Sequence, residues 1–325
     1  MSPPWLIVCA SFLFATMGVC VKLASVDYPA GEIVFYRGLT GALMMLGLTR
    51  WHRGTIATRV AAMHFWRSLS GVTALVLWFY AIGNLPLATA MTLNYLSSVW
   101  MALFLIGGAV AVGAPTLPSV AAPRGGSAGL GAARRPAGGA SRVDGRLIAT
   151  VLVGFAGVAL ILRPTIAEQQ LWHGLMGLLS GVIAATAYLQ VTALGRAGEP
   201  EYRIVFYFSF GSVLAGAATL LWTGLHAHTV RGAALLLAVG VLATVAQLMT
   251  TRAYSRGRTL VNASLQYLGI AWSFAYGVIL FGDHVTALAL SGMLLIVVAG
   301  LSATLLRSRS GRAAIATIAD PPNTV

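Results

Sequence analysis

One arginine inside an apolar segment is the strongest candidate for a functional role. Arg37 lies in Phe35-Tyr36-Arg37-Gly38, about five residues into an apolar run at 32–49. A charge at membrane depth costs free energy and normally faces protein or water, so it marks a candidate functional site. It would serve as the counter-ion of a carboxylate or phosphate on a bound molecule. Snorkelling to the outer interface, or pairing with Glu32 or Asp283, are the structural alternatives.

Amides and aromatic side chains inside other apolar runs form a second group of candidates. An amide in hydrocarbon needs a partner, either on another helix or on a ligand, and both readings stay open. Aromatic rings can stack on a planar or cationic ligand, or simply pack in the core. Together with the arginine, eight residues are expected to line a cavity: Arg37, Asn94, Tyr95, Trp100, Gln247, Gln266, Tyr267 and Trp272.

The remaining polar residues indicate neither a metal site nor a cofactor site. Cys9 and Cys20 lie eleven residues apart on one expected helix, too far to bond to each other there. No His, Cys, Asp or Glu cluster has metal-ligand spacing, and no Gly-Lys-Ser/Thr loop for a nucleotide is present. Lys22 is expected to snorkel to the interface, and Asp283 to cap the last helix.

Composition excludes a soluble protein. The 325 residues are 58% hydrophobic and 9% charged, whereas a soluble domain has about 25% charged residues. The net charge of +13 does not indicate nucleic-acid binding, because the basic residues lie between apolar runs. Ten runs are long enough to cross a bilayer. The predicted spans are 5–23, 32–49, 65–83, 87–112, 147–163, 172–194, 203–222, 231–251, 259–281 and 286–306.

Basic residues orient these helices. With both ends of the chain in the cytoplasm, 17 Lys and Arg residues fall in inside segments and three in outside segments. The positive-inside rule therefore predicts both termini inside and an even number of helices. The first run lacks a positive n-region before it, so it is expected to be a retained helix and not a secretory signal. The expected location is the bacterial inner membrane.

Two sequence matches at nearly one offset indicate an internal duplication. Residues 33–36 (IVFY) recur at 204–207, and 93–96 (LNYL) with Trp100 recur as 265–268 (LQYL) with Trp272. The offsets are 171 and 172. Five helices is an odd number, so the second copy is inverted relative to the first. Many secondary carriers share this plan and bind their solute at the repeat interface.

An extra stretch at 113–146 interrupts the first copy. It is rich in Ala, Gly, Pro and Arg, and a disordered cytoplasmic loop is expected, with a regulatory or lipid-contacting role as the alternative. The predicted organisation follows in chain order: 1–112 for the first four helices, 113–146 for the loop, 147–163 for the fifth helix, 172–306 for the second repeat and 307–325 for a disordered tail.

The pattern resembles the EamA family of the drug/metabolite transporter superfamily. The resemblance rests on ten helices in two halves, the segment LPLATAMTLNYLSSVW, and the segment FGDHVTALALSGMLLIVVAGL, where Gly282-Asp283 stands in for the family's usual Gly-Glu. It implies a central cavity lined by both halves, and family members often have an arginine at the position of Arg37. Arg67-Ser68 and LNYL resemble the S-adenosylmethionine-carrier branch.

A secondary carrier working by alternating access is the expected function, for a small metabolite such as an amino acid or an S-adenosylmethionine-like compound. A membrane-embedded transferase is the alternative, but it requires clustered Asp, His or Cys at one membrane face. A channel would show a ring motif. The expected partners are a small-molecule solute and the lipid bilayer, without nucleic acid; a homodimer stays open.

Overall fold

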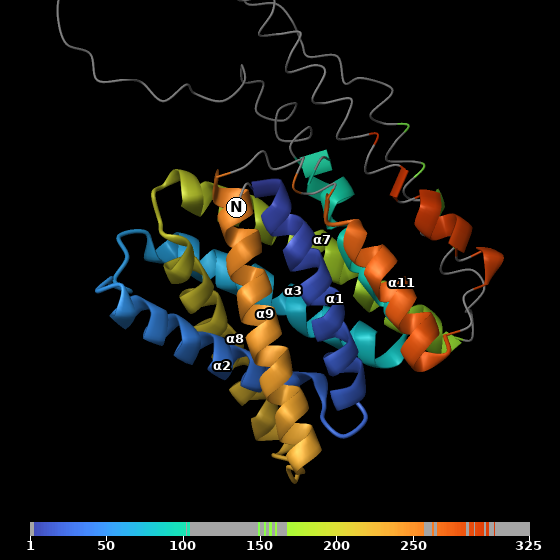
Figure 1. Ribbon diagram of the computed structural model, residues 1–325, viewed down its shortest axis with the longest axis horizontal. Helices are drawn as coiled ribbons and strands as arrows, with labels where there is room; N and C mark the ends of the chain where they lie inside the picture. The colour runs from blue at the N-terminus through green and yellow to red at the C-terminus, as the bar shows by residue number, and fades with distance from the viewer. Residues whose placement is uncertain are drawn as a thin grey trace, which may run out of the picture.

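The apolar runs form long helices, and strands are absent from the part of the chain that is described. The computed structural model describes residues 3–101, 103–104, 168–256 and 265–283, together with Asn262 and scattered positions within 149–160 and 286–302. The helices are α1 (Pro3–Ala24), α2 (Ala30–Trp51), α3 (Ala61–Asn84), α4 (Leu87–Tyr95), α7 (Glu168–Arg196), α8 (Glu201–Thr223), α9 (Val230–Arg256) and α11 (Leu268–Phe281) (Figure 1).

Six of these helices coincide with the ranges of predicted spans, with ends displaced by no more than five residues. Within the described residues, five segments are long and apolar enough to cross a membrane: Trp5–Ala24, Ala61–Asn84, Leu171–Arg196, Glu201–Thr223 and Val230–Arg256. The expected loop at 113–146, most of the expected fifth helix at 147–163 and the expected tail at 307–325 lie outside the described residues.

The expected continuous helix at 87–112 is interrupted after Tyr95. Helix α4 ends at Tyr95, followed by a turn at Leu96. The Ser98 hydroxyl donates to the Tyr95 carbonyl at 2.7 Å, and the Val99 amide bonds to Leu96 instead. The matching segment of the second half shows the same feature, because Gln266 and Tyr267 form a turn just before α11.

Helices from the two halves of the chain pack against each other in pairs: α2 with α8, α1 with α9, and α3 with α7. Glycines permit the closest of these contacts. A Cβ atom at Gly38 would lie 2.7 Å from the Ser209 carbonyl oxygen, and one at Gly216 would lie 2.6 Å from the backbone of Phe35. In a membrane the hydrophobic effect does not drive helices together, because lipid tails are as apolar as the side chains. Small residues instead let two helix backbones approach closely and pack well.

The bundle has two chemically different ends. At the end where α1 begins, called the N-terminal end, α2, α7 and α9 finish with Arg50, Arg196 and Arg256 in their last turns (Figure 1). At the opposite end, α1 finishes with Lys22. The charge asymmetry read from the sequence therefore lies along the axis of the bundle.

Candidate functional site

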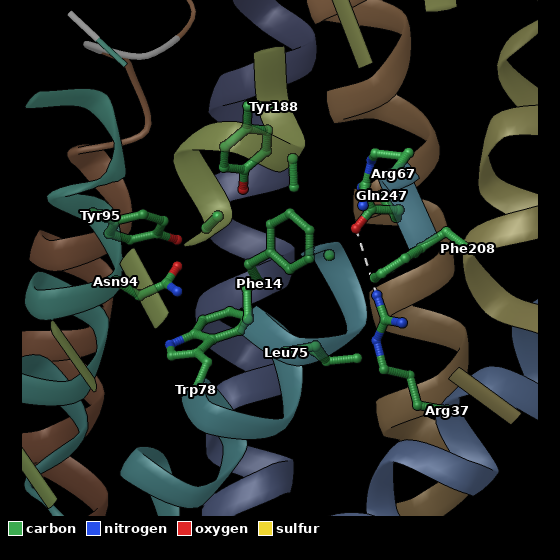
Figure 2. A pocket seen from close by; sticks show the side chains of 14 residues that line it. Phe14, Arg37, Arg67, Leu75, Trp78, Asn94, Tyr95, Tyr188, Phe208 and Gln247 are labelled. Carbon is green, nitrogen blue, oxygen red and sulfur yellow. Dashed lines mark hydrogen bonds between the residues drawn. The ribbon is translucent and has the colours of Figure 1, made fainter. Parts of the chain in front are cut away.

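A polar cavity lies in the interior of the bundle, where helices of both halves meet. Its walls come from α1, α2, α3 and α4 of the first half and from α7, α8 and α9 of the second (Figure 2). Its free volume is about 50 Å³, which is room for a few water molecules. A metabolite therefore fits only after the surrounding helices or side chains move apart.

Two buried arginines define one side of the cavity. Arg37 is the eighth residue of α2, which begins at the opposite end, and Arg67 is the seventh residue of α3, which begins at the N-terminal end. Each side chain is only 3% exposed. Both guanidinium groups lie over the ring of Phe208 from α8, at 4.8 Å and 4.5 Å from its centroid. Figure 2 shows this ring between the two cations.

The carboxylates considered as partners of Arg37 are engaged elsewhere. Glu32 contacts two histidines, and Asp283 contacts Lys22. The Arg37 Nη2 atom instead donates to the Gln247 side-chain oxygen at 3.5 Å, the outer limit of a hydrogen bond. The structural alternatives for Arg37, an ion pair with Glu32 or Asp283 or a snorkelling side chain, do not describe the folded chain.

The other side of the cavity is formed at the interruption after α4. Asn94 and Tyr95 are the last two residues of α4, and both line the cavity. Asn94 Nδ2 donates to the Ser180 hydroxyl of α7 at 3.0 Å. Phe14, Trp78 and Tyr188 lie between this amide and the arginines (Figure 2). The cavity thus has a cationic side, an amide and phenol side, and aromatic walls between them.

The structure brings half of the eight predicted site residues together at this cavity, namely Arg37, Asn94, Tyr95 and Gln247. The other four lie outside its lining. Trp100 packs on Phe104, and the hydroxyl groups of Tyr267 and Ser98 are hydrogen-bonded at 2.7 Å. Gln266 is buried, while Trp272 is 42% exposed and contacts Phe12 edge to face.

Sequence reasoning did not propose Arg67 or Phe208 as cavity residues. Arg67 falls near the start of an apolar run, where basic residues usually flank a span and mark its cytoplasmic side. The spacing of residues along α3 could have identified Arg67 as a cavity residue. Arg67, Gly71, Ala74 and Trp78 recur at intervals of three or four, which places them on one face of α3, and all four line the cavity. Gly71 leaves the room that the Arg67 guanidinium occupies.

A polar cluster joins the two halves at the N-terminal end. Glu199, between α7 and α8, accepts hydrogen bonds from Arg203 at 3.0 Å and Thr58 at 2.9 Å, and lies 3.1 Å from His64 Nε2. Burial raises the pKa of Glu199, but hydrogen bonds from Arg203, His64 and Thr58 outweigh burial and hold the pKa below the ordinary glutamate value. Arg203 also donates to the Thr55 carbonyl at 2.9 Å.

A second set of contacts joins the halves at the opposite end. The fully buried carboxylate of Glu32 lies 2.8 Å from His226 and 3.3 Å from His228. Lys22 donates to the Leu85 carbonyl at 2.9 Å and lies 3.8 Å from Asp283, so its ammonium is paired within the protein. Asp283 accepts a hydrogen bond from the Leu87 amide at the start of α4 at 3.2 Å, and its expected role as cap of the last helix adjoins residues that lie outside the described part of the chain.

These features define a class of protein. Several apolar helices, close packing through glycine and an interior cavity lined by polar and aromatic side chains of both halves describe a multi-pass membrane protein that transports a small solute. Within the described residues, no group of three or more His, Cys, Asp or Glu side chains is placed to hold a metal ion.

Comparisons with known proteins agree with the assignment to membrane transporters. Residues 1–107 match the EamA-like transporter family. The chain is 31% identical over 307 residues to the pseudopaline exporter CntI of Pseudomonas aeruginosa, across 94% of this chain and 96% of that protein. It is 24% identical over 310 residues to an uncharacterized transporter of Helicobacter pylori, across 91% and 92% of the two chains. A solved crystal structure shares the fold with a TM-score of 0.65 at 17% identity, across 94% and 97%.

The chain belongs to the EamA-like transporter family. It is a membrane transporter and not an enzyme, which confirms the family resemblance and sets aside the transferase alternative.

Proposed function

We propose that this protein is a secondary transporter that exports a small metabolite across the bacterial inner membrane by alternating access, with the cavity around Arg37 as its solute site. The single observation that carries the assignment of the site is the cavity itself, a space that buried polar side chains from both halves line. Export is supported by the activity named for the Pseudomonas aeruginosa relatives.

The proposed architecture has ten helices in two inverted five-helix repeats, with both termini in the cytoplasm. Its support is the pair of sequence matches near an offset of 171 and the turns at Leu96 and at Gln266 and Tyr267, which lie within two residues of each other at that offset. Carriers with inverted repeats typically place broken helices at the solute site. Polar contacts between the halves at both ends fit a closed intermediate, from which either end opens when its contacts break.

Counterflow in proteoliposomes tests the function. Vesicles with and without unlabelled internal solute are offered labelled amino acids, S-adenosylmethionine and pseudopaline, the last because of the relatives' named activity. Saturable uptake that internal solute stimulates would establish a carrier. Arg37→Gln should reduce this uptake at least tenfold, while Arg59→Gln, with the same loss of charge at an exposed loop position, should not.

Unchanged transport by Arg37→Gln would remove the cavity from the solute path. Absence of stimulated uptake of any compound, in protein shown to be folded and inserted, would count against the carrier assignment for this set of solutes.

A further inference from the structure

We propose that the solute is an organic anion, with a carboxylate bound jointly by Arg37 and Arg67 and a second oxygen acceptor placed near Trp78 and Tyr95. The inference rests on the proposed function, since it takes the cavity as the solute site. It adds the chemical class of the solute and the residues that select it.

The charge balance of the cavity is the first argument. Both guanidinium carbons lie within 5 Å of the same ring centroid, so they are less than about 10 Å apart. Among the described residues that line the cavity, none is Asp or Glu. Arginine stays protonated in proteins, and a buried unpaired charge costs several kcal/mol. One aromatic face and one long amide contact offset only part of that cost, so an anionic solute would complement these two charges.

The hydrogen-bond inventory is the second argument. In the described part of the chain, five buried polar atoms of the cavity lining have no hydrogen-bond partner: Arg37 Nε, Arg67 Nε, Arg67 Nη1, Trp78 Nε1 and the Tyr95 hydroxyl. All five carry a hydrogen that can be donated. Buried donors normally find acceptors. A solute rich in oxygen acceptors therefore completes the cavity, whereas a solute rich in donors leaves these groups unpaired.

The positions of the donors divide the solute into two parts. The three arginine atoms lie on the Phe208 side, and Trp78 and Tyr95 lie beyond Phe14 (Figure 2). A carboxylate has two oxygens and about four acceptor positions, enough for three guanidinium donors. A phosphate dianion has three terminal oxygens and would be left with more unmet acceptors. A planar carboxylate also fits beside planar guanidinium groups and an aromatic face. The far acceptor is a carbonyl, a hydroxyl or a second carboxylate.

A cation has no complement in this cavity. A solute with net positive charge, such as an S-adenosylmethionine-like compound, would meet two guanidinium groups without a lining carboxylate. Like charges at this depth repel strongly because the dielectric is low. The cavity therefore argues against the cationic solutes that the family resemblance includes, and it favours acids.

The first test needs no knowledge of the solute. In non-ionic detergent, without added anions other than chloride, Arg67→Met should have a higher melting temperature than the wild type. Replacing an uncompensated buried charge by an apolar side chain of similar length is stabilising. Arg203→Met is the matched control, because Arg203 pairs with Glu199 and the Thr55 carbonyl and its loss should lower the melting temperature. A lower melting temperature for Arg67→Met would overturn the charge argument.

The second test uses matched ligands on the full-length wild type. Glutarate, its neutral diamide glutaramide, citrate, glycerol 3-phosphate and tetraethylammonium are compared for thermal stabilisation at millimolar concentration. Stabilisation by a carboxylate, but not by glutaramide or tetraethylammonium, supports the inference. Arg67→Gln should weaken that affinity roughly ten- to hundredfold, and Arg67→Lys should restore only part of it, since lysine lacks the fork of donors.

The outcomes separate the two proposals. Transport of a neutral or cationic solute with no carboxylate binding would overturn the anion inference and leave the carrier intact. A carboxylate could bind to the wild type, fail to bind to Arg67→Gln and yet not be transported. That outcome would support the anion site and count against the proposal that this site serves transport. Binding of glycerol 3-phosphate alone, or stabilisation by no carboxylate at all, would overturn the carboxylate assignment.

Discussion

Arg37 and Phe208 occupy matching positions in the two halves of the chain. Phe208 follows Arg37 by 171 residues, the offset that relates IVFY at 33–36 to IVFY at 204–207. The first half supplies a cation at this position, and the second half supplies the aromatic face on which that cation lies. A symmetric backbone plan thus yields a chemically asymmetric site, which is what recognition of an asymmetric solute requires.

Gly71 provides a sharp test at the scale of single residues. A Cβ atom there would collide with the Arg67 guanidinium and would lie 2.9 Å from the Phe208 ring. Gly71→Ala should therefore displace Arg67 and reduce transport at least tenfold, even though alanine favours a helix by about 1 kcal/mol. The measurement is counterflow with the solute identified for the wild type.

Gly47→Ala is the matched control for this substitution. Gly47 is also helical, and a Cβ atom there meets nothing within 4 Å. It should retain wild-type transport and a wild-type or higher melting temperature. Equal transport by both variants would show that the position of Arg67 does not matter for the solute.

At the scale of elements, the contacts at the N-terminal end join parts of the chain that alternating access must separate. Glu199 connects the turn between α7 and α8 to Thr58 before α3 and to His64 within it. Because the pKa of Glu199 is lowered in the folded state, its ionised form stabilises the fold above the ordinary glutamate pKa. That stabilisation is lost as the pH falls through the lower folded value.

Glu199→Gln should lower the free energy of unfolding by about 1–3 kcal/mol at pH 7, the range for hydrogen bonds to a charged group. The difference from wild type should shrink below about pH 4, where the unfolded carboxylate begins to bind a proton. Melting temperatures in detergent across this pH range measure it. Asp27→Asn, at an exposed position, should show no such difference. If the difference in melting temperature between Glu199→Gln and the wild type stays the same at acid pH, the effect comes from packing and not from the charge of Glu199.

At the scale of the whole molecule, the arginine-rich N-terminal end of the bundle is proposed to face the cytoplasm. The loop before α3 lies at that end, and the loop between α8 and α9 lies at the opposite end. In a background of Cys9→Ala and Cys20→Ala, cysteine is placed at Ala57 or at Leu225, both exposed. In spheroplasts, an impermeant maleimide should label position 225 and not position 57. The reverse pattern would invert the proposed topology.

Local properties were readable from the sequence alone. Span length and hydropathy depend on consecutive residues, so six long helices were predicted to within five residues at each end. Arg37, Asn94, Tyr95 and Gln247 were found because a polar group at membrane depth is costly wherever the chain folds. Membership of the transporter family was likewise visible in short segments and helix number.

Only the tertiary structure decided which groups meet. Glu32 and Arg37 stand five residues apart, yet Glu32 pairs with histidines about 195 residues further along the chain and Arg37 lies over Phe208. Arg67 looked like a flanking charge because its depth depends on where α3 begins and on the space left by Gly71. The sequence shows which polar residues lie at membrane depth, because that depends on neighbouring residues in the chain. Which partners these residues find depends on how distant helices pack, and only the tertiary structure shows it.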